Sequence, residues 1–373
     1  MKGNRTEAAL VATNSITQGQ QVEPLWKPLF DDGLVINFAH RSFPWASESQ
    51  SAAQVHVVIV GFGYEDWEKK TLFTYTSGGQ VEVEHPNNIN AYLTPAANVF
   101  AARRSKPLSA PLLMVAGGKP TDGTHLLMDH SSVKSEPEAA KWIRRFSMGE
   151  EFIKGRDRYC LWLVGISPNE LKDMPLVRER VERVRETRLK STKADTPWLF
   201  DEIRYEGVGE YIAVPAVSSE RRSYIPMGFV DDGMIPGNKI YFVPTDSRYV
   251  FGILMSRVHN AWMRALGGRL KSDYNYANTI VYNTLVWPDA TDADRTQIEA
   301  AAQAVLDARG QYPGATLEEL YDPDNGWLYP ALTRAHQNLD DAVEHAYGFA
   351  PGTEEKDIVA HLFDLYAKMV NGA

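Results

Sequence analysis

The segment SRVHNAWMRALGGRLKSDYNYANTIVYNTLVWP, residues 256–288, decides how the surrounding chain is organised. Its first part predicts a helix, because apolar residues recur there at i, i+4 and i+8, namely at Val258, Trp262 and Leu266. Gly267-Gly268 follows directly, and glycine at the C′ position allows the left-handed turn that ends a helix. A second apolar run, Thr279–Val286, predicts a buried strand that ends at Trp287-Pro288.

The loop between these two elements combines basic and aromatic residues. Arg264, Arg269 and Lys271 interleave with Tyr274 and Tyr276. Cationic side chains hold phosphates and planar side chains face bases, so the loop has the composition of a nucleic-acid contact. The alternative is a helix, a glycine turn and a strand whose tyrosines belong to the core.

Length and composition indicate a globular protein of several domains. The 373 residues suffice for two or three domains. No apolar run approaches the roughly 18 residues of a membrane helix, and no secretion leader is recognisable, which favours a cytoplasmic protein without membrane contact. Cys160 is the only cysteine, and the nine histidines show no metal-ligand spacing, so neither an internal disulfide nor a metal site is expected.

Charge is distributed unevenly along the chain. The net charge is −9, yet residues 289–373 carry 16 acidic and five basic residues, which leaves the remainder slightly positive. A near-neutral body rich in arginine can present a basic groove even when the whole protein is acidic. The overall charge therefore does not exclude nucleic acid as a partner.

The N-terminal residues predict a fragment of an α/β domain. Strands are expected at Ala8–Ile16, Leu34–Ala39 and Val55–Gly61, with a helix at Gln20–Phe30. Runs that are apolar throughout suggest burial on both faces, as in a doubly wound sheet. Three strands and one helix cannot complete such a sheet, so the chain is expected to begin partway through a fold. Gly61-Phe-Gly63 is not expected to bind a dinucleotide phosphate, because Asp66 stands where the third glycine belongs.

Residues 71–288 predict a mixed α+β region without a simple period. Helices are expected at Glu136–Phe146 and Pro175–Lys190, and strands at Tyr159–Val164, Tyr211–Val214 and Lys239–Val243. The mixed charges of the second helix favour an ion-paired solvent face over a nucleic-acid surface. Glu170 and Lys172 have the spacing of a metal-dependent nuclease pair, but Pro168 places them in a turn or at a helix start.

Residues 289–373 predict helices throughout. Three apolar stripes, which begin near Ile298, Leu328 and Ile358, indicate three amphipathic helices. Gly310 and Gly348 are expected just after two of them. Such helices form a small bundle, and without a catalytic constellation its expected role is packing or spacing.

Seven phrases, in order along nearly the whole chain, resemble the carboxyl-terminal half of MmeI-like type IIL restriction–modification proteins. They are VATNSITQGQQVEPLW (11–26), INFAHRSFPW followed by VHVVIVGF (36–62), RYCLWL (158–163), VPAVSSERRSYIP (214–226), a run of FGIL with a later Ser, His and Trp (251–262), GRLKSDYNYANTIVYNTLVWP (268–288) and AHQNLDDAVEHAYG (335–348). Members of that family join a nuclease, an adenine-N6 DNA methyltransferase and a target-recognition domain in one chain.

The resemblance implies an α+β protein of three parts. Residues 1–70 would be the carboxyl-terminal part of a Rossmann-like methyltransferase domain, residues 71–288 the DNA target-recognition domain, and residues 289–373 a helical bundle. The family's glycine-rich S-adenosylmethionine loop and its catalytic Asn-Pro-Pro-Phe/Tyr loop have no match in this sequence. The chain alone is therefore expected to hold no catalytic residue and no cofactor, whereas the complete enzyme uses S-adenosylmethionine. The expected partners are double-stranded DNA and, if the enzyme is split, a separate chain that carries the catalytic half.

The resemblance also implies a pocket for the target adenine. A methyltransferase that acts on adenine N6 flips the base out of the duplex, and its pocket needs aromatic surface to replace the lost stacking. Phe43 and Trp45 match the place where the family supplies such a wall, and Asn14 is assigned to the same pocket. The alternative is that both aromatic residues are part of an ordinary core.

Reading a DNA sequence requires arginine for guanine and an acidic side chain for the cytosine amino group. Ser218-Ser-Glu220-Arg221-Arg222 places an acid beside two arginines. In an extended loop, Glu220 and Arg222 would point to the same side and read one base pair together. The alternative is a surface ion pair. The further DNA-binding residues expected from the segment 256–288 are Arg264, Arg269, Lys271, Asp273, Tyr274, Asn275 and Tyr276.

Sequence-specific DNA recognition within a type II restriction–modification methyltransferase is the function that these observations favour. The rival hypothesis is a free-standing protein-interaction module, whose acidic helical tail binds a partner protein and whose arginines are structural. A contiguous positive groove lined by Arg221, Arg222, Arg269 and Lys271 would favour DNA over the rival.

Overall fold

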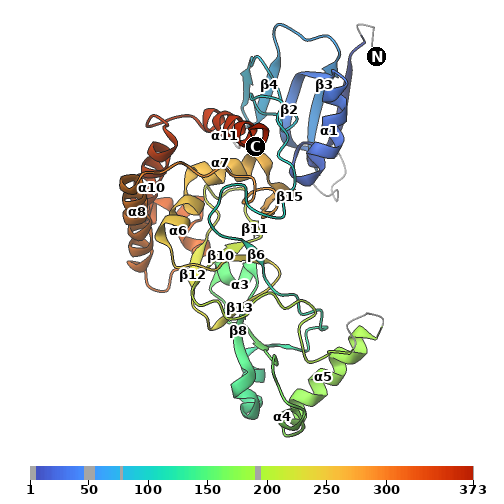
Figure 1. Cartoon of the computed structure of the whole chain (residues 1–373), viewed down its shortest axis with the longest axis vertical. Coiled ribbons are helices and arrows are strands. Elements are labelled where there is room, and N and C mark those ends of the chain that lie inside the picture. Colours follow the sequence, from blue (N-terminus) through green and yellow to red (C-terminus); the bar gives the residue numbers. More distant parts are fainter. Residues whose placement is uncertain (1–5, 46–54, 76–78, 190–194, 373) are drawn as a thin grey trace.

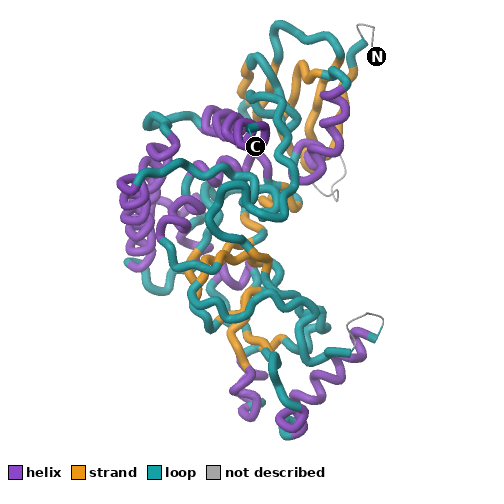
Figure 2. The backbone as a smooth tube through the Cα atoms, viewed as in Figure 1, coloured by secondary structure: helices purple, strands orange, loops and turns teal. Residues whose placement is uncertain are grey.

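The backbone follows a C-shaped outline, with the N-terminal sheet at one end and two helices, α4 (Pro168–Lys172) and α5 (Pro175–Arg188), at the other (Figure 1, Figure 2). The structure, a computed structural model, describes residues 6–45, 55–75, 79–189 and 195–372. Within these residues, no helix has the length and the apolar character needed to cross a membrane.

The N-terminal sheet has the strand order β1-β3-β2-β4-β5. Its elements and the helices beside them are β1 (Ala8–Thr13), η1 (Asn14–Thr17), η2 (Gly19–Gln21), α1 (Val22–Asp31), β2 (Val35–Trp45), β3 (Val55–Gly63), β4 (Thr71–Tyr75) and β5 (Val81–Glu84). Only β2 and β4 run parallel, and the other pairs are antiparallel. The sheet thus differs from the parallel doubly wound arrangement suggested by its apolar strands, because the connection from β2 to β3 is too short for a parallel crossover.

Gly61 and Gly63 both lie inside β3 rather than in a turn. A Cβ atom at Gly61 would collide with the ring of Phe38 on the neighbouring strand, so glycine here allows Phe38 to pack across β3. This close approach gives the glycine a structural role. Both glycines thus belong to a strand and not to a turn that opens a helix.

The middle of the chain forms two four-stranded sheets, ordered β12-β10-β14-β6 and β13-β8-β9-β7. Besides α4 and α5, the elements here are β6 (Val115–Ala116), β7 (Leu127–Met128), α2 (His130–Ser135), η3 (Pro137–Trp142), β8 (Ile143–Ser147), α3 (Gly149–Lys154), β9 (Tyr159–Leu161), β10 (Tyr211–Pro215), β12 (Gly228–Val230), β13 (Met234–Pro236) and β14 (Ile240–Val243). The strands expected near Tyr159, Tyr211 and Lys239 and the helix that begins at Pro175 are confirmed.

The helix expected over Glu136–Phe146 was wrong, because this segment divides into η3 and β8. β8 pairs in parallel with the distant strand β13 and antiparallel with the following strand β9, and this pairing overrides the local helical pattern. The expectation for Glu170 is confirmed. Its side chain completes a capping box with Ser167 at the start of α4 and lies 2.8 Å from the ammonium group of Lys141.

The segment 256–288 begins with the expected helix and then departs from expectation. Ser256 caps α7 (Arg257–Leu266), which follows α6 (Arg248–Met255). Gly267 is extended, with φ −61°, rather than left-handed; a Cβ atom there would lie 2.5 Å from the carbonyl oxygen of Met263, so glycine is needed for space. The chain then forms a small sheet from β15 (Gly268–Leu270), β16 (Asp273–Asn275) and β11 (Val217–Ser218).

The strand expected over Thr279–Val286 was also wrong, because these residues form hydrogen-bonded turns. The amide of Val281 donates to the Ala277 carbonyl at 2.8 Å. The side-chain amide of Asn278 donates to the Met114 carbonyl, and that of Asn283 to the Arg104 carbonyl, at 2.7 and 2.8 Å. Contacts with a distant loop therefore decide the conformation of this apolar run.

The C-terminal part consists of α8 (Asp292–Gly310), α9 (Leu317–Leu320), η4 (Pro323–Leu328), α10 (Pro330–Tyr347) and α11 (Glu355–Asn371). α8 and α10 lie on the outer side of the C, and α10 ends at Gly348 in the left-handed conformation expected for it. α11 packs against α7, where Trp262 and Phe363 have ring centroids 4.9 Å apart. One core thus joins the N-terminal sheet, α7 and the C-terminal helices, and a second core lies around β8, β9 and α5.

Candidate nucleic-acid interface

A cavity of about 1040 Å³, here called the main cavity, brings three distant parts of the chain together. From the N-terminal sheet and from the segment 219–274 it is lined by Asn14, Ser42, Phe43, Pro44, His56, Tyr75, Gly79, Glu220, Arg221, Arg269, Ser272 and Tyr274. The C-terminal part contributes Pro323 and Asp324. Six residues assigned to DNA from sequence therefore line one space, namely Asn14, Phe43, Glu220, Arg221, Arg269 and Tyr274.

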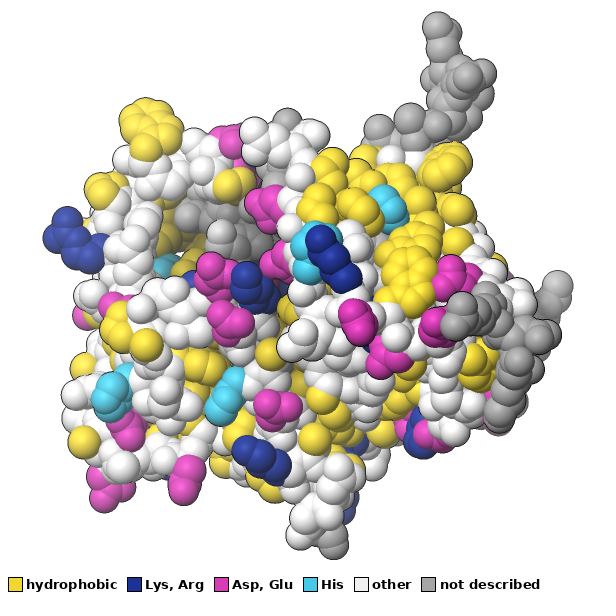
Figure 3. Space-filling view, turned by 90° about the horizontal axis from the view of Figure 1, so that it is seen from above, with side chains coloured by type: hydrophobic (Ala, Val, Ile, Leu, Met, Phe, Trp, Pro, Cys, Tyr) yellow, Lys and Arg dark blue, Asp and Glu magenta, His cyan; other side chains and the backbone are white. Residues whose placement is uncertain are grey.

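The wall of the main cavity at the N-terminal sheet is aromatic. The rings of Phe43 and Tyr75 have centroids 4.7 Å apart, and the Tyr75 hydroxyl lies 2.7 Å from Nδ1 of His40. Burial lowers the pKa of His40 below its ordinary value, which favours the neutral ring. Trp45 is about half exposed, and its ring centroid is 6.4 Å from that of Phe43. Hydrophobic side chains gather at this end of the molecule in Figure 3.

Asn14 occupies the rim of this aromatic wall. It is the first residue of η1, and its side-chain amide donates to the hydroxyl of Ser42 at 3.1 Å. Nδ1 of His56, another lining residue, is buried without a hydrogen-bond partner among the described residues. The wall therefore offers polar groups beside stacking surface, as a pocket for a planar heterocycle requires.

The loop that follows β11 is a tight turn rather than an extended segment. The amide of Arg222 donates to the Ser219 carbonyl at 3.2 Å, and the amide of Arg221 donates to the Ser219 hydroxyl at 3.3 Å. The loop is therefore not extended, so the condition under which Glu220 and Arg222 were expected to point to the same side is not met. Both residues nevertheless line a second space of about 360 Å³, here called the side cavity, together with Tyr274.

The charged side chains of this turn have different partners. Glu220 lies 3.6 Å from Arg269, and Arg221 lies 2.6 Å from Asp324. Nε of Arg222 is buried and has no hydrogen-bond partner among the described residues. Burial lowers the pKa of Arg222 from its ordinary value. A buried donor without a partner costs free energy, so an acceptor that reached Nε of Arg222 would lower that cost.

The hairpin of β15 and β16 holds the other basic residues. The guanidinium of Arg269 lies 3.9 Å from the centroid of the Tyr274 ring and donates to the Ser272 carbonyl at 2.9 Å. Lys271 is exposed at the turn with φ 58°, a left-handed conformation, and forms no ion pair within the described part of the chain. Asp273 is half-buried and Asn275 is exposed. Neither of these last two residues lines the main cavity.

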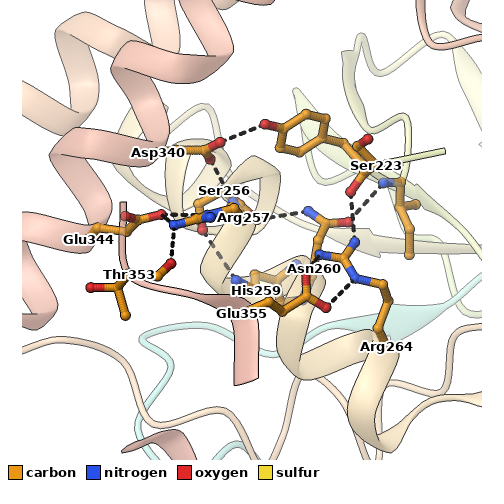
Figure 4. A network of polar contacts seen from close by, with 12 residues as sticks. Ser223, Ser256, Arg257, His259, Asn260, Arg264, Asp340, Glu344, Thr353 and Glu355 are labelled. Carbon is orange, nitrogen blue, oxygen red and sulfur yellow. Dashed lines mark hydrogen bonds and ion pairs between the residues drawn. The ribbon is translucent and has the colours of Figure 1, made fainter. Parts of the chain in front are cut away.

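Two of the expected DNA-binding residues have structural partners instead. Tyr276 is buried, and its hydroxyl lies 2.9 Å from Nε2 of His259, as the alternative of a core tyrosine predicts. Arg264 forms two hydrogen bonds to the carboxylate of Glu355, at 2.8 and 2.7 Å, and donates to the Ser223 carbonyl at 2.8 Å (Figure 4). Arg264 lines the side cavity while it fastens the turn to α11.

The base of the turn is also fastened to α10. The Tyr224 hydroxyl donates to the carboxylate of Asp340 at 2.6 Å, and the Tyr224 ring stacks on His336 at 4.2 Å. Burial raises the pKa of Asp340 to about 6. Figure 4 shows how Asp340, Glu344 and Arg257 continue this network at the start of α7. The C-terminal helices therefore hold the turn in place.

Sequence reasoning missed several lining residues. Ser42, His56 and Tyr75 belong to strands whose apolar pattern gives no sign of a pocket, and Asp324 lies 103 residues from its partner Arg221. No signal in the sequence links such distant positions. Within the described residues, no group of three or more His, Cys, Asp or Glu side chains could hold a metal ion.

Comparisons with known proteins cover almost the whole chain. Family models match residues 1–74 as "MmeI, DNA-methyltransferase domain", residues 95–289 as "MmeI, target recognition domain", and residues 290–372 as "MmeI, C-terminal domain". DNA methyltransferase A of Bacillus subtilis (strain 168) is 39% identical over 97% of this chain, which spans 42% of that relative.

A solved structure gives the same result. The type IIL restriction-modification enzyme MmeI, in complex with DNA, is 41% identical to this chain and superposes with a TM-score of 0.93 over 99% of this chain and 50% of that one. The type IIG restriction endonuclease BpuSI is 10% identical with a TM-score of 0.37 over 92% of this chain and 48% of its own, which is too little similarity for an argument. The chain spans about half the length of the relatives it matches. It belongs to the MmeI family of type IIL restriction–modification proteins.

Proposed function

We propose that this chain binds double-stranded DNA along the main cavity and reads its sequence, as the target-recognition part of a restriction–modification adenine-N6 methyltransferase. One observation carries the proposal. Aromatic surface from Phe43 and Tyr75 and charged groups from Glu220, Arg221 and Arg269 line the same cavity. The first set suits a base removed from its stack, and the second suits phosphates and base edges.

The target-recognition model, which matches residues 95–289, supports this function, and the comparisons give no support to a free-standing protein-interaction module. The target-base pocket is proposed at Phe43, Trp45 and Asn14. Arg264 and Tyr276 are proposed to support the DNA-binding residues from beneath, because both are engaged with partners inside the protein.

Methyl transfer is proposed for the complete enzyme. S-adenosylmethionine is the cofactor that a DNA methyltransferase of this family uses, and the residues that bind it are proposed to lie outside these 373 residues, on the same polypeptide or on a separate chain. A protein that acts on bacterial DNA is proposed to work in the cytoplasm. The domain boundaries proposed from sequence, at residues 70 and 288, are compatible with recognition by this chain and methyl transfer by the complete enzyme.

Removing one phosphate contact is expected to weaken DNA binding on every sequence. Arg269→Ala and Lys271→Ala should each reduce the slope of log affinity against log salt by about 0.9, because each phosphate contact releases its share of counterions. Fluorescence anisotropy with a labelled duplex at several salt concentrations measures both quantities. Arg334→Ala, at an exposed position on α10, is the control and should leave the slope unchanged. Salt-independent binding, or none at low salt, would count against the proposed function.

Exchanging the charges of Glu220 and Arg222 is expected to change which base is preferred at one position. The double variant Glu220→Lys and Arg222→Asp reverses donor and acceptor beside the side cavity, and a bidentate base contact discriminates by about 1 to 3 kcal/mol, or about 5- to 150-fold. Binding selection from a randomised duplex pool reads the preference. An unaltered preference in a folded double variant would make this pair structural and would move the reading role to Lys271, Asp273 and Asn275.

A further inference from the structure

The C-terminal segment Asp322–Leu328 borders the main cavity although sequence reasoning assigned its region to packing or spacing. Pro323 and Asp324 both line the cavity. The backbone of the segment is fixed locally, since the Asp322 carboxylate accepts from the amide of Asp324 at 3.0 Å and the side-chain amide of Asn325 donates to the Glu319 carbonyl at 3.2 Å. The carboxylate of Asp324 is left to face the turn that follows β11.

Asp324 holds Arg221, which is at the tip of that turn. Nη2 of Arg221 lies 2.6 Å from Oδ2 of Asp324. The two side chains are 57% and 71% exposed, so the guanidinium is open to solvent on its remaining sides. Exposed ion pairs contribute only about 0 to 1 kcal/mol, and such a pair opens readily when a stronger anion arrives.

Arg222, the arginine next to Arg221, is also influenced by acidic groups of this region. Burial lowers the pKa of Arg222, and the negative charges of Glu318, Asp322 and Asp273 oppose that lowering. Two of these three acids belong to the same C-terminal region as Asp324. Acidic groups of this region therefore act on both Arg221, which lines the main cavity, and Arg222, which lines the side cavity.

We propose that the segment Asp322–Leu328 is part of the DNA-binding surface and that Asp324 competes with a DNA phosphate for Arg221. The inference rests on the proposed function and adds a segment of the C-terminal part to the DNA-binding surface. In the free protein, the carboxylate occupies the place that a phosphate oxygen takes in the complex. Duplex DNA must displace Asp324 and approach its charge, so this residue weakens sequence-independent binding.

The test compares the full chain with Asp324→Asn on a labelled duplex of random sequence across a salt series. The variant is expected to bind about 3- to 8-fold more tightly at 0.1 M salt, because DNA no longer has to displace a carboxylate from Arg221. Arg221→Ala should weaken binding. Adding Asp324→Asn to Arg221→Ala should give no further gain, because the competition requires both side chains.

Asp341→Asn is the matched control, since it removes the same charge from an exposed position on α10 outside the cavity. An equal gain in affinity from Asp341→Asn, or a gain that persists in the Arg221→Ala background, would mean that the tighter binding comes from net charge alone. Either result would overturn the inference. Unchanged binding by Asp324→Asn in a chain that binds DNA overturns the inference alone. A chain that binds no duplex at low salt overturns the proposed function together with it.

Discussion

Replacing Arg188 by methionine is expected to lower the free energy of unfolding of the second core by about 4 kcal/mol. Arg188 is 1% exposed at the end of α5 and donates to the carbonyls of Thr121, Thr196, Pro120 and Leu199 at 2.8, 3.2, 2.5 and 2.9 Å. Each hydrogen bond from a charged donor contributes about 1 kcal/mol or more, and the bond to the Pro120 carbonyl is buried. Hydrogen exchange followed by mass spectrometry measures the loss as reduced protection of β8 and β9.

Arg183→Met on the same helix is the control for this experiment. Arg183 is 57% exposed and pairs with Glu179, which is equally exposed. Such a surface pair contributes about 0 to 1 kcal/mol, so protection of β8 and β9 should be nearly unchanged. Equal losses in the two variants would mean that the four carbonyls find other donors, and the clamp role of Arg188 would then be rejected. α8 and α10, which belong to the other core, should keep their protection in both variants.

Acidification from pH 6.5 towards pH 4 is expected to destabilise the first core through two buried histidines. Burial lowers the pKa of His259 to about 4, and burial together with the charge of Arg309 lowers that of His336 to about 3. Both rings stay neutral in the folded protein while the unfolded chain takes up protons below about pH 6.5. Their stabilising contribution is therefore present above pH 6.5 and lost as the pH falls, by roughly 1.4 kcal/mol per pH unit for each histidine.

Asp340 opposes this trend. Because burial raises its pKa to about 6, the folded protein binds this proton before the unfolded chain does, and stability rises as the pH falls from about 6 towards the ordinary value of 3.8. For these three groups together, the expected net loss is roughly 1.4 kcal/mol per pH unit between pH 6 and 4. Urea unfolding at several pH values measures the slope.

The histidine variants separate the contributions. His336→Gln should remove about 1.4 kcal/mol per pH unit from the slope, because it deletes one group that titrates only in the unfolded chain. His345→Gln replaces a histidine that is 75% exposed and serves as the control. A slope that is the same in the His336→Gln variant and the unmodified chain would show that this ring is accessible to protons in the folded protein.

Local patterns predicted those elements that depend on neighbours in sequence. The apolar stripe of α7, the capping residues of α4 and the mixed-charge face of α5 all lie within a few turns of helix. Predictions failed where distant groups decide the backbone. The run Thr279–Val286 has the composition of a strand, but Asn278 and Asn283 tie it to the carbonyls of a loop far away in sequence.

The candidate site shows the same division. The resemblance to a family supplied Phe43, the chemistry of base reading supplied Glu220, and the basic and aromatic composition of the loop supplied Arg269. All three line the main cavity. Composition could not distinguish Tyr274, which lines the cavity, from Tyr276, which binds His259 in the core. Both tyrosines are buried, so contacts with distant parts of the chain, and not the local pattern, decide which of them borders the cavity.

The core shared by α7 and the C-terminal helices limits how recognition segments can be exchanged between relatives. A cassette cut at residues 71 and 288 would carry Trp262 into the recipient but leave its packing partner Phe363 behind. It would also separate Tyr224 from Asp340 and Arg264 from Glu355. A chimaera that transfers the recognition segment together with residues 289–372 keeps these contacts as one unit, so the transplantable module is longer than the segment that faces DNA.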